Sequence, residues 1–193
     1  YGQGLMTQAA LLLDEMTDAE NFINLMVTHC YLPRLEGWTA PEGIILHRSG
    51  EYWVPVNGYL GQDSHLADSQ KALRLMFGLD DNNPENLRIK PRYPVSWNEM
   101  SISNIPVLTG NARQNIKYSY LREDAKQDFS FELEKPVKNM SVRLGPIPDS
   151  REIKNATFNG KPLFFENQAS GDSRWVWLKN LNGRTGKVVI YYQ

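Results

Sequence analysis

Apolar side chains recur at helical spacing through the first third of the chain. Over residues 4–16 they fall every three or four positions and share one face of a predicted helix: Leu5, Ala9, Leu12 and Met16. Thr17 and Glu20 have the spacing of a capping box, which predicts that a second helix begins here and continues to about residue 32. Because almost no linker separates the two helices, we expect an antiparallel hairpin.

The second predicted helix has an apolar stripe of its own: Phe22, Leu25, Met26 and His29. Pro33 then ends the helical run. On a third predicted helix, residues 65–78, the apolar side is formed by Leu66, Leu73 and Phe77. Asp63 or Ser64 suits its start and Gly78 its C-terminal stop. Three helices of this length cannot close a large core alone, so their apolar faces imply further partners.

From about residue 87 the period of the pattern changes to two, which predicts β-strands. Segment 87–97 contains prolines and fits a strand near an edge or a bridging segment. Alternating apolar positions follow in six further segments: 115–122, 128–135, 140–147, 156–165, 174–181 and 187–193. Asn159-Gly160 predicts a hairpin turn, and Asn182-Gly183 separates the last two segments. Short strands divided by turns favour an antiparallel β-sandwich.

The predicted fold class is therefore α+β, with a helical segment followed by an antiparallel β-sandwich. Residues 1–98 would hold the helices and their connector, and residues 99–193 the sandwich. No flexible linker or low-complexity tract lies between them, so we expect the two parts to form one rigid unit. The chain begins at Tyr1 without an initiator Met or a signal-peptide pattern, and it is interpreted as a piece of a longer polypeptide.

The segment between the second and third helices is rich in carboxylates and aromatic rings. It includes Glu36, Glu42 and Glu51, interleaved with Trp38, Tyr52, Trp53 and Tyr59. Sugars present C–H faces that stack on aromatic rings, and their hydroxyl groups need polar partners. Hydrolysis of a glycosidic bond needs two carboxyl groups that flank it. The segment is therefore either the rim of a sugar site or a long connector with buried aromatic residues.

Composition limits the other classes of function. The 193 residues are 41% hydrophobic and 22% charged with a net charge of −1, which predicts a globular protein with no general attraction to nucleic acid. No stretch reaches the roughly 20 apolar residues that a membrane helix needs. The three histidines are too widely spaced to propose a metal site, and no cofactor-binding motif is present. The single cysteine, Cys30, excludes an internal disulfide and is expected to be a buried, inert thiol.

The end of the third helix and the segment after it carry a more specific pattern. Gly78-Leu79-Asp80 is followed by Arg88-Ile89-Lys90-Pro91-Arg92-Tyr93-Pro94. This order resembles the end of the catalytic domain in α-L-rhamnosidases of glycoside hydrolase family 78. There, the last helix of a six-hairpin α/α toroid leads through such a turn and strand into a C-terminal β-sandwich. Over the sandwich, the resemblance rests on the strand pattern and on the hairpin of residues 158–163.

The resemblance implies a role for the carboxylate-rich segment. In such enzymes the general base is a Glu in the loop before the last helix, within a Trp-Glu pair that this chain lacks. Glu42 is the first candidate for that base in an inverting mechanism, and Glu36 is the second. The side chains expected to contact the sugar are Trp38, His47, Trp53 and His65. The general acid would lie upstream, outside this chain, so the 193 residues alone would be inactive.

The resemblance also implies the partners: a carbohydrate substrate and the missing N-terminal part of the parent chain. A glycan-degrading role is consistent with a periplasmic or extracellular parent. Two other functions are compatible with the pattern. A carbohydrate-binding or scaffolding module would expose a row of Trp and Tyr on one face of the sandwich. An accessory domain that binds only the rest of its polypeptide would expose large apolar patches on the three helices.

Overall fold

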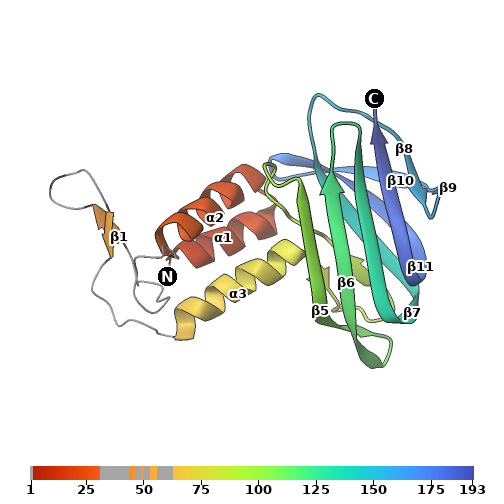
Figure 1. The fold of residues 1–193 in the computed structure, drawn as a ribbon, viewed down its shortest axis with the longest axis horizontal. Coiled ribbons are helices and arrows are strands. Elements are labelled where there is room, and N and C mark those ends of the chain that lie inside the picture. Colours follow the sequence, from red (N-terminus) through yellow and green to blue (C-terminus); the bar gives the residue numbers. More distant parts are fainter. Residues whose placement is uncertain (1, 31–43, 47–48, 50–52, 56–62) are drawn as a thin grey trace.

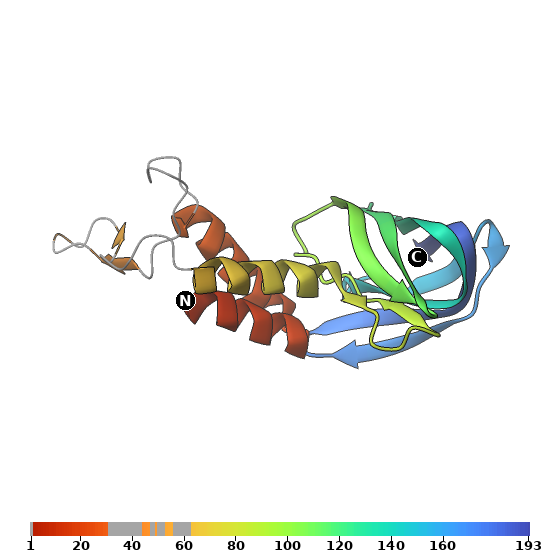
Figure 2. The same cartoon turned by 90° about the horizontal axis from the view of Figure 1, so that it is seen from below.

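The computed structural model describes residues 2–30, 44–46, 49, 53–55 and 63–193. Three helices pack side by side next to one end of a large curled sheet: α1 (Gly2–Leu13), α2 (Met16–Cys30) and α3 (Asp63–Phe77) (Figures 1 and 2). A two-stranded hairpin, β1 (Ile44–Leu46) with β2 (Trp53–Pro55), lies at the ends of the helices that point away from the sheet. The mixed α+β class predicted from the sequence is confirmed at this level.

The large sheet contains nine strands. They are β3 (Leu79–Asp80), β4 (Leu87–Ile89), β5 (Glu99–Thr109), β6 (Ala112–Arg122), β7 (Lys126–Ile147), β8 (Ile153–Phe158), β9 (Lys161–Pro162), β10 (Phe165–Ser170) and β11 (Ser173–Tyr192). Strands β4 and β7 are parallel, and the other paired strands are antiparallel. The hairpin predicted at Asn159-Gly160 is confirmed, with Phe158 paired to Lys161.

Two long strands, β7 and β11, run through the whole sheet. The first part of β7 pairs with the last part of β11, and there the sheet continues through β6 and β5 on one side and β8 and β9 on the other. The last part of β7 pairs with the first part of β11, flanked by β4 and β10. The two groups of strands are therefore one continuous sheet, not the two separate sheets of a standard sandwich.

The sequence pattern divided each long strand in two, and in both cases the division was wrong. The interruption at Pro136 falls inside β7, and Asn182-Gly183 falls inside β11 where a turn was expected. The ladder between the two strands shifts register on both sides of Gly183, whose φ is 110°. Irregular pairing of this kind absorbs residues that do not fit a regular ladder, so the strand bends and continues.

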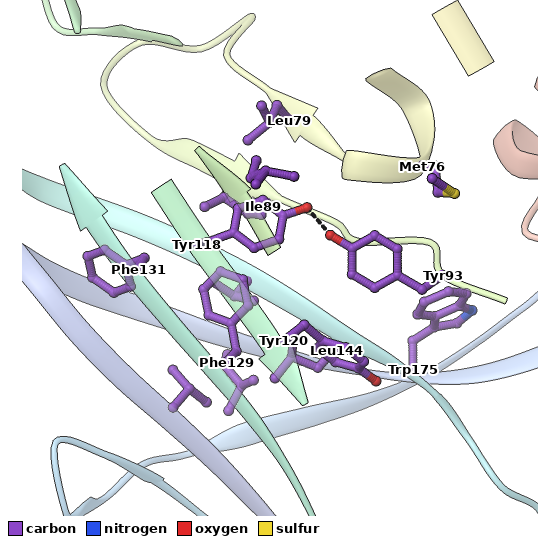
Figure 3. Packing of buried hydrophobic residues seen from close by; sticks show 14 of the residues in the cluster. Met76, Leu79, Ile89, Tyr93, Tyr118, Tyr120, Phe129, Phe131, Leu144 and Trp175 are labelled. Atoms are coloured by element: carbon purple, nitrogen blue, oxygen red, sulfur yellow. Dashed lines mark hydrogen bonds between the residues drawn. The ribbon is translucent and has the colours of Figure 1, made fainter. Parts of the chain in front are cut away.

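Buried aromatic and aliphatic side chains pack together against the strands of the sheet (Figure 3). The predicted alternation is confirmed on β6 and β7, where the apolar members are buried: Ile116, Tyr118, Tyr120, Phe129, Phe131 and Leu133. Residues 140–147 are buried on both faces instead of alternating, because this part of β7 also lies next to the helices and their connector. One hydrophobic cluster includes residues of the helices, the connector and the sheet.

The buried faces of the helices differ from those predicted. In α1, Ala10 and Leu11 are buried, whereas Leu5 and Leu12 are 46% and 60% exposed. Leucine, methionine and alanine occur all round this helix, so spacing alone does not select one face. Likewise α3 buries Ala72 and Met76 and exposes Leu73, while α2 buries Ala19 and Ile23 and exposes Leu25. Phe22 and Phe77 are partly buried against the core, as expected.

Candidate functional site

The structure leaves the predicted catalytic segment untested. Glu36, Trp38, Glu42 and His47 lie outside the described residues. Trp53 belongs to β2, where it pairs with Leu46, and His65 lies in the first turn of α3. The side chains of these two residues are also outside the described set, as is that of Cys30. The described residues instead build a polar site where the helices meet the sheet.

Asp14, between α1 and α2, is the centre of this junction. Its φ is 60°, a left-handed conformation that aspartate tolerates better than most residues and that ends α1 after Leu13. The residue is only 4% exposed. The sequence pattern placed Asp14 inside the first helix, but it forms the link between two helices.

Asp14 receives hydrogen bonds from three distant parts of the chain. Arg143 of β7 donates from Nη1 to Oδ2 (2.7 Å) and from Nη2 to Oδ1 (2.6 Å). Arg92 of the connector donates from Nε to Oδ1 (2.9 Å), and the Ser170 hydroxyl of β10 donates to Oδ2 (2.7 Å). A helix end, the connector and two strands are thereby joined at one carboxylate. We call these four residues the Asp14 cluster.

The electrostatics of the Asp14 cluster fix its charge state. Burial opposes ionisation of Asp14, but the hydrogen bonds from Arg143, Ser170 and Arg92 more than offset it, so its pKa lies below the usual value. The Arg143 guanidinium also lies 4.1 Å from the centre of the Trp175 ring, a cation–π contact. The lowered pKa favours the ionised form of Asp14, and both of its oxygens accept hydrogen bonds, so it is unsuited to act as a general base.

The turn between β10 and β11 binds the start of α2. Asp172 accepts hydrogen bonds from the backbone N–H groups of Met16 (2.8 Å) and Thr17 (2.9 Å), and so caps α2. The capping box predicted from Thr17 and Glu20 is therefore wrong. Glu20 instead accepts a hydrogen bond from the N–H of Val95 (2.9 Å). A cap supplied from about 155 positions away cannot be recognised by local spacing.

The end of α3 is held by the connector and by buried tyrosines. Gly78 donates its N–H to the carbonyls of Arg74 and Leu75 (both 3.1 Å), and with φ at 68° it ends the helix as predicted. The Tyr118 hydroxyl donates to the carbonyl of Phe77 (2.7 Å) and accepts from Tyr93 (Figure 3). Burial raises the pKa of both tyrosines, so they remain neutral donors.

A cavity of about 400 Å³ lies beside the Asp14 cluster, between α1, α3 and the connector. Four cationic side chains and one carboxylate line it: Lys71, Arg74, Lys90, Arg92 and Asp80. Lys90 donates to Asp80 (2.7 Å), and Arg74 contacts Asp81 (3.4 Å). Lys90 and Asp80 bring a cation and a carboxylate together, but no second carboxylate lines the cavity, so it lacks the pair that glycoside hydrolysis requires.

Two further findings concern the described part of the chain. No group of three or more His, Cys, Asp or Glu side chains there is arranged to hold a metal ion. None of its helices is long and apolar enough to cross a membrane.

Comparison with known proteins finds only weak structural similarity. The sequence matches no protein-family model and no curated protein. Among solved structures, an α-L-rhamnosidase from Dictyoglumus thermophilum is similar at TM-score 0.45 and 7% identity, over 72% of this chain and 15% of that protein. An α-1,4-glucan lyase from Gracilariopsis lemaneiformis is similar at TM-score 0.39 and 11% identity, over 54% of this chain and 13% of that protein. At these values neither structure determines the function of this chain.

Proposed function

We propose that this chain is the C-terminal part of a glycoside hydrolase that acts on α-L-rhamnosides or related glycosides with inversion. The observation that carries the proposal is the path from α3 into the sheet. The helix ends at Gly78, passes through β3 and β4, and reaches the sheet through the prolines of residues 91–94. This is the order of helix, turn, strand and sheet on which the resemblance to family 78 rests.

Hydrogen bonds hold the motif residues of this path against the end of α3, which supports treating helix and connector as one structural unit. Lys90 donates its N–H to the carbonyl of Gly78 (2.8 Å), and Arg92 donates its N–H to that of Met76 (2.8 Å). Side chains from the same stretch bind Asp80 and Asp14. The connector therefore fixes α3, and with it the start of this helix, relative to the sheet.

In this proposal, Glu42 activates the attacking water and Glu36 is the alternative base. The general acid belongs to the upstream part of the parent, because one carboxyl group cannot both protonate the leaving oxygen and activate water on the opposite face. Trp38, His47, Trp53 and His65 would contact the sugar. No cofactor or metal takes part in this mechanism.

The exposed apolar side chains on the helices support a partner within the parent protein. They are Leu5, Met6, Leu12 and Leu13 of α1, Leu25 of α2 and Leu73 of α3, each at least 41% exposed. Apolar surface concentrated on one part of a soluble protein marks an interaction site. Further helices of the parent toroid would cover these side chains.

The other proposed functions make different use of the aromatic residues. A carbohydrate-binding module would present a row of exposed Trp and Tyr. The tryptophans whose side chains the structure describes, Trp97, Trp175 and Trp177, are buried or half-buried. Tyr191, at 38%, is the one Tyr or Trp among the exposed large apolar side chains that the structure describes. The exposed leucines therefore favour attachment to a larger protein over a stand-alone sugar-binding face.

Substitution of the two candidate bases tests the proposal. In the parent protein, Glu42→Gln should lower kcat for an aryl α-L-rhamnoside by about 10²–10⁴-fold, the contribution of a general base. Glu36→Gln should leave most of the rate, and Glu85→Gln, in an exposed turn before β4, serves as the matched control. Full activity of Glu42→Gln with loss in Glu36→Gln would transfer the role to Glu36. Full activity of both variants would refute this site.

A further inference from the structure

Four parts of the chain meet at one end of the sheet. They are the segment before β5, the β6–β7 turn, the β7–β8 turn and the end of β11, and Figure 1 shows the β6–β7 turn next to the end of β11. Arg122 donates its N–H to the carbonyl of Asn98 (2.6 Å), and Tyr192 donates its N–H to that of Ala125 (2.9 Å). Backbone hydrogen bonds therefore hold these segments in fixed positions relative to one another.

Two arginine side chains add to this support. Arg122 donates from Nη1 to the carbonyl of Val95 (2.7 Å) and from Nη2 to that of Gly145 (3.4 Å), so it joins the segment before β5 to β7. Arg174 donates from Nη2 to the carbonyl of Arg151 (2.8 Å), which fixes the β7–β8 turn against the start of β11. Loops that a rigid sheet positions in this way are common sites of ligand binding.

Two cavities lie among these segments. The first, of about 470 Å³, is formed by the segment before β5, the two turns and the end of β11. The second, of about 440 Å³, lies between the β7–β8 turn, β10 and the start of β11. Arg151 lines both, so the cavities are neighbours. None of the exposed apolar side chains that the parent protein would cover lines either cavity.

We propose that the two cavities together bind a neutral oligosaccharide, with one sugar unit in each cavity and Arg151 between them. The proposal rests on the proposed function for the class of ligand. It adds to that function an accessory site for the glycan, formed by the sheet and separate from the candidate bases Glu36 and Glu42.

The charges of the lining favour a neutral ligand. Three arginines and three carboxylates line the two cavities: Arg122, Arg151, Arg174, Glu123, Asp124 and Glu152. Because neither sign is in excess, the lining selects neither an anion nor a cation. A sugar hydroxyl both donates and accepts hydrogen bonds, so neighbouring hydroxyls can bind a guanidinium and a carboxylate at the same time.

Several of the polar groups are available to a ligand. Among the residues that the structure describes, the side chains of Asp124 and Arg151 make no hydrogen bond or ion pair, and the same holds for the side-chain amides of Asn98 and Asn167. Asn98 and Asp124 line the first cavity, Asn167 lines the second, and Arg151 lines both. A sugar can therefore bind to these groups without breaking a contact within the protein.

Apolar side chains of the second cavity complete the match to a sugar ring. Ile147, Ile153 and Ala169 line it beside the polar groups, and they can contact the C–H face of the ring. A zwitterionic peptide could also bind to Asp124 and Arg151 through its charges. It would leave the amide and the apolar side chains of the second cavity unused, whereas a disaccharide would use both cavities.

Rutinose and rhamnose form a matched pair of probes, because rutinose is a disaccharide of rhamnose and glucose. We expect rutinose to shift the amide resonances of residues around Arg122, Arg151 and Asn167 in the 193-residue chain. Its affinity should exceed that of rhamnose by about tenfold, because the second sugar unit adds hydrogen bonds in the second cavity. The affinity should not change as salt is added, because the ligand carries no charge.

A variant of the shared residue completes the test. Arg151→Gln should weaken rutinose binding by about tenfold, the effect of one charge-assisted hydrogen bond. It should not lower Tm, because this side chain makes no hydrogen bond or ion pair within the described part of the chain. Arg113→Gln, an exposed change at the opposite end of β6, is the matched control and should leave binding unchanged.

Three outcomes would each overturn the proposal. Equal affinity for rhamnose and rutinose would exclude a ligand that spans both cavities. Unchanged affinity in Arg151→Gln would place the sugar elsewhere. Tighter binding of the zwitterionic dipeptide Gly-Gly than of rutinose would show that the site binds peptides.

This test is independent of the test of the proposed function. Binding is measured without turnover, so a chain that binds rutinose at these residues while its parent hydrolyses no glycoside would reject the proposed function alone. A parent that hydrolyses rhamnosides while the chain binds no oligosaccharide would reject the proposal for these cavities alone.

Discussion

At the scale of residues, the environments of polar side chains depend on partners far away in the sequence. Asp14 and Arg143 lie 129 positions apart and share two hydrogen bonds. The pattern of segment 140–147 assigned Arg143 to the solvent side of a strand, because its neighbours Val142 and Leu144 are apolar. The strand face that was expected to meet water meets the helix hairpin instead, so its charge is buried and paired. The sequence shows an Asp near the end of a helix and an Arg between apolar residues of a strand. Neither residue indicates that the other is its partner.

Replacement of Asp14 by Asn should reveal how strongly this carboxylate holds the molecule together. Asn tolerates the same left-handed backbone, so the change removes charge without adding backbone strain. Two arginines would then be buried without a counter-charge, and we expect a loss of about 3–5 kcal/mol in the free energy of unfolding measured in urea. Asp149→Asn, whose side chain is 97% exposed, should change it by less than about 0.5 kcal/mol. A similarly small loss in Asp14→Asn would show that the cluster contributes little to stability.

At the scale of elements, local pattern predicted segments of β6, β7, β8 and β11 but missed β5 entirely and misplaced the ends of the long strands. The alternation of Ile116, Tyr118 and Tyr120 was recognisable because one side of β6 faces the core and the other faces solvent. The continuity of β7 and β11 could not be recognised, because a proline in β7 and the Asn-Gly pair in β11 normally stop a strand. Here the strands continue through them, and the pairing between the strands shifts register nearby. In α1 the apolar residues on all sides left the buried face undetermined until α2 and α3 were in place.

The close contact between the β10–β11 turn and the helices can be tested by comparing Ala substitutions at two glycines that have nearly equal φ. Gly171 has φ 59° and a Cβ there would lie 2.2 Å from the carbonyl oxygen of Asp14, whereas Gly110 has φ 56° and open space. Both Ala variants bear the strain of a left-handed conformation, about 1–2 kcal/mol. Gly171→Ala must also push the turn away from the helices. It should therefore lose about 1–3 kcal/mol more than Gly110→Ala in thermal unfolding. Equal losses would contradict this close approach.

The cap on α2 should make the stability of the chain depend on pH. Burial opposes ionisation of Asp172, but hydrogen bonds from Ser173, Thr17 and Met16 lower its pKa to about 2, against about 3.9 for an unfolded Asp. Since the folded pKa is the lower one, the contribution of this carboxylate is complete above about pH 4 and is lost as the pH falls toward 2.

Asp172→Asn should therefore be less stable than the unmodified chain at pH 7, and the difference should shrink as the pH falls from 4 to 2. Asp124→Asn, in the exposed loop between β6 and β7, is the matched control and should not change this slope. Denaturation curves across this pH range provide the measurement. A difference between Asp172→Asn and the unmodified chain that stays constant with pH would show that the cap does not depend on the charge of Asp172.

At the scale of the whole molecule, the order of helices, connector and antiparallel sheet could be predicted from the change in hydrophobic period. The junction between the two parts could not be predicted. It depends on hydrogen bonds that Asp14, Asp172 and Glu20 accept from partners far away in the sequence, which local sequence patterns do not indicate. The predicted catalytic segment stays a prediction, since Glu36, Glu42 and their neighbours lie outside the described residues. The exposed leucines of α1–α3 are nevertheless consistent with a chain that belongs to a larger protein.

The most direct test of the central claim is to measure aryl α-L-rhamnoside hydrolysis by the parent protein and by the 193-residue chain under the same conditions. The account predicts that the parent releases the aryl group and that the chain alone does not, because the general acid lies in the upstream part. Turnover by the chain alone would contradict the proposed division of the two carboxylates. Absence of turnover in a correctly folded parent, for this and other aryl glycosides, would contradict a role in glycoside hydrolysis.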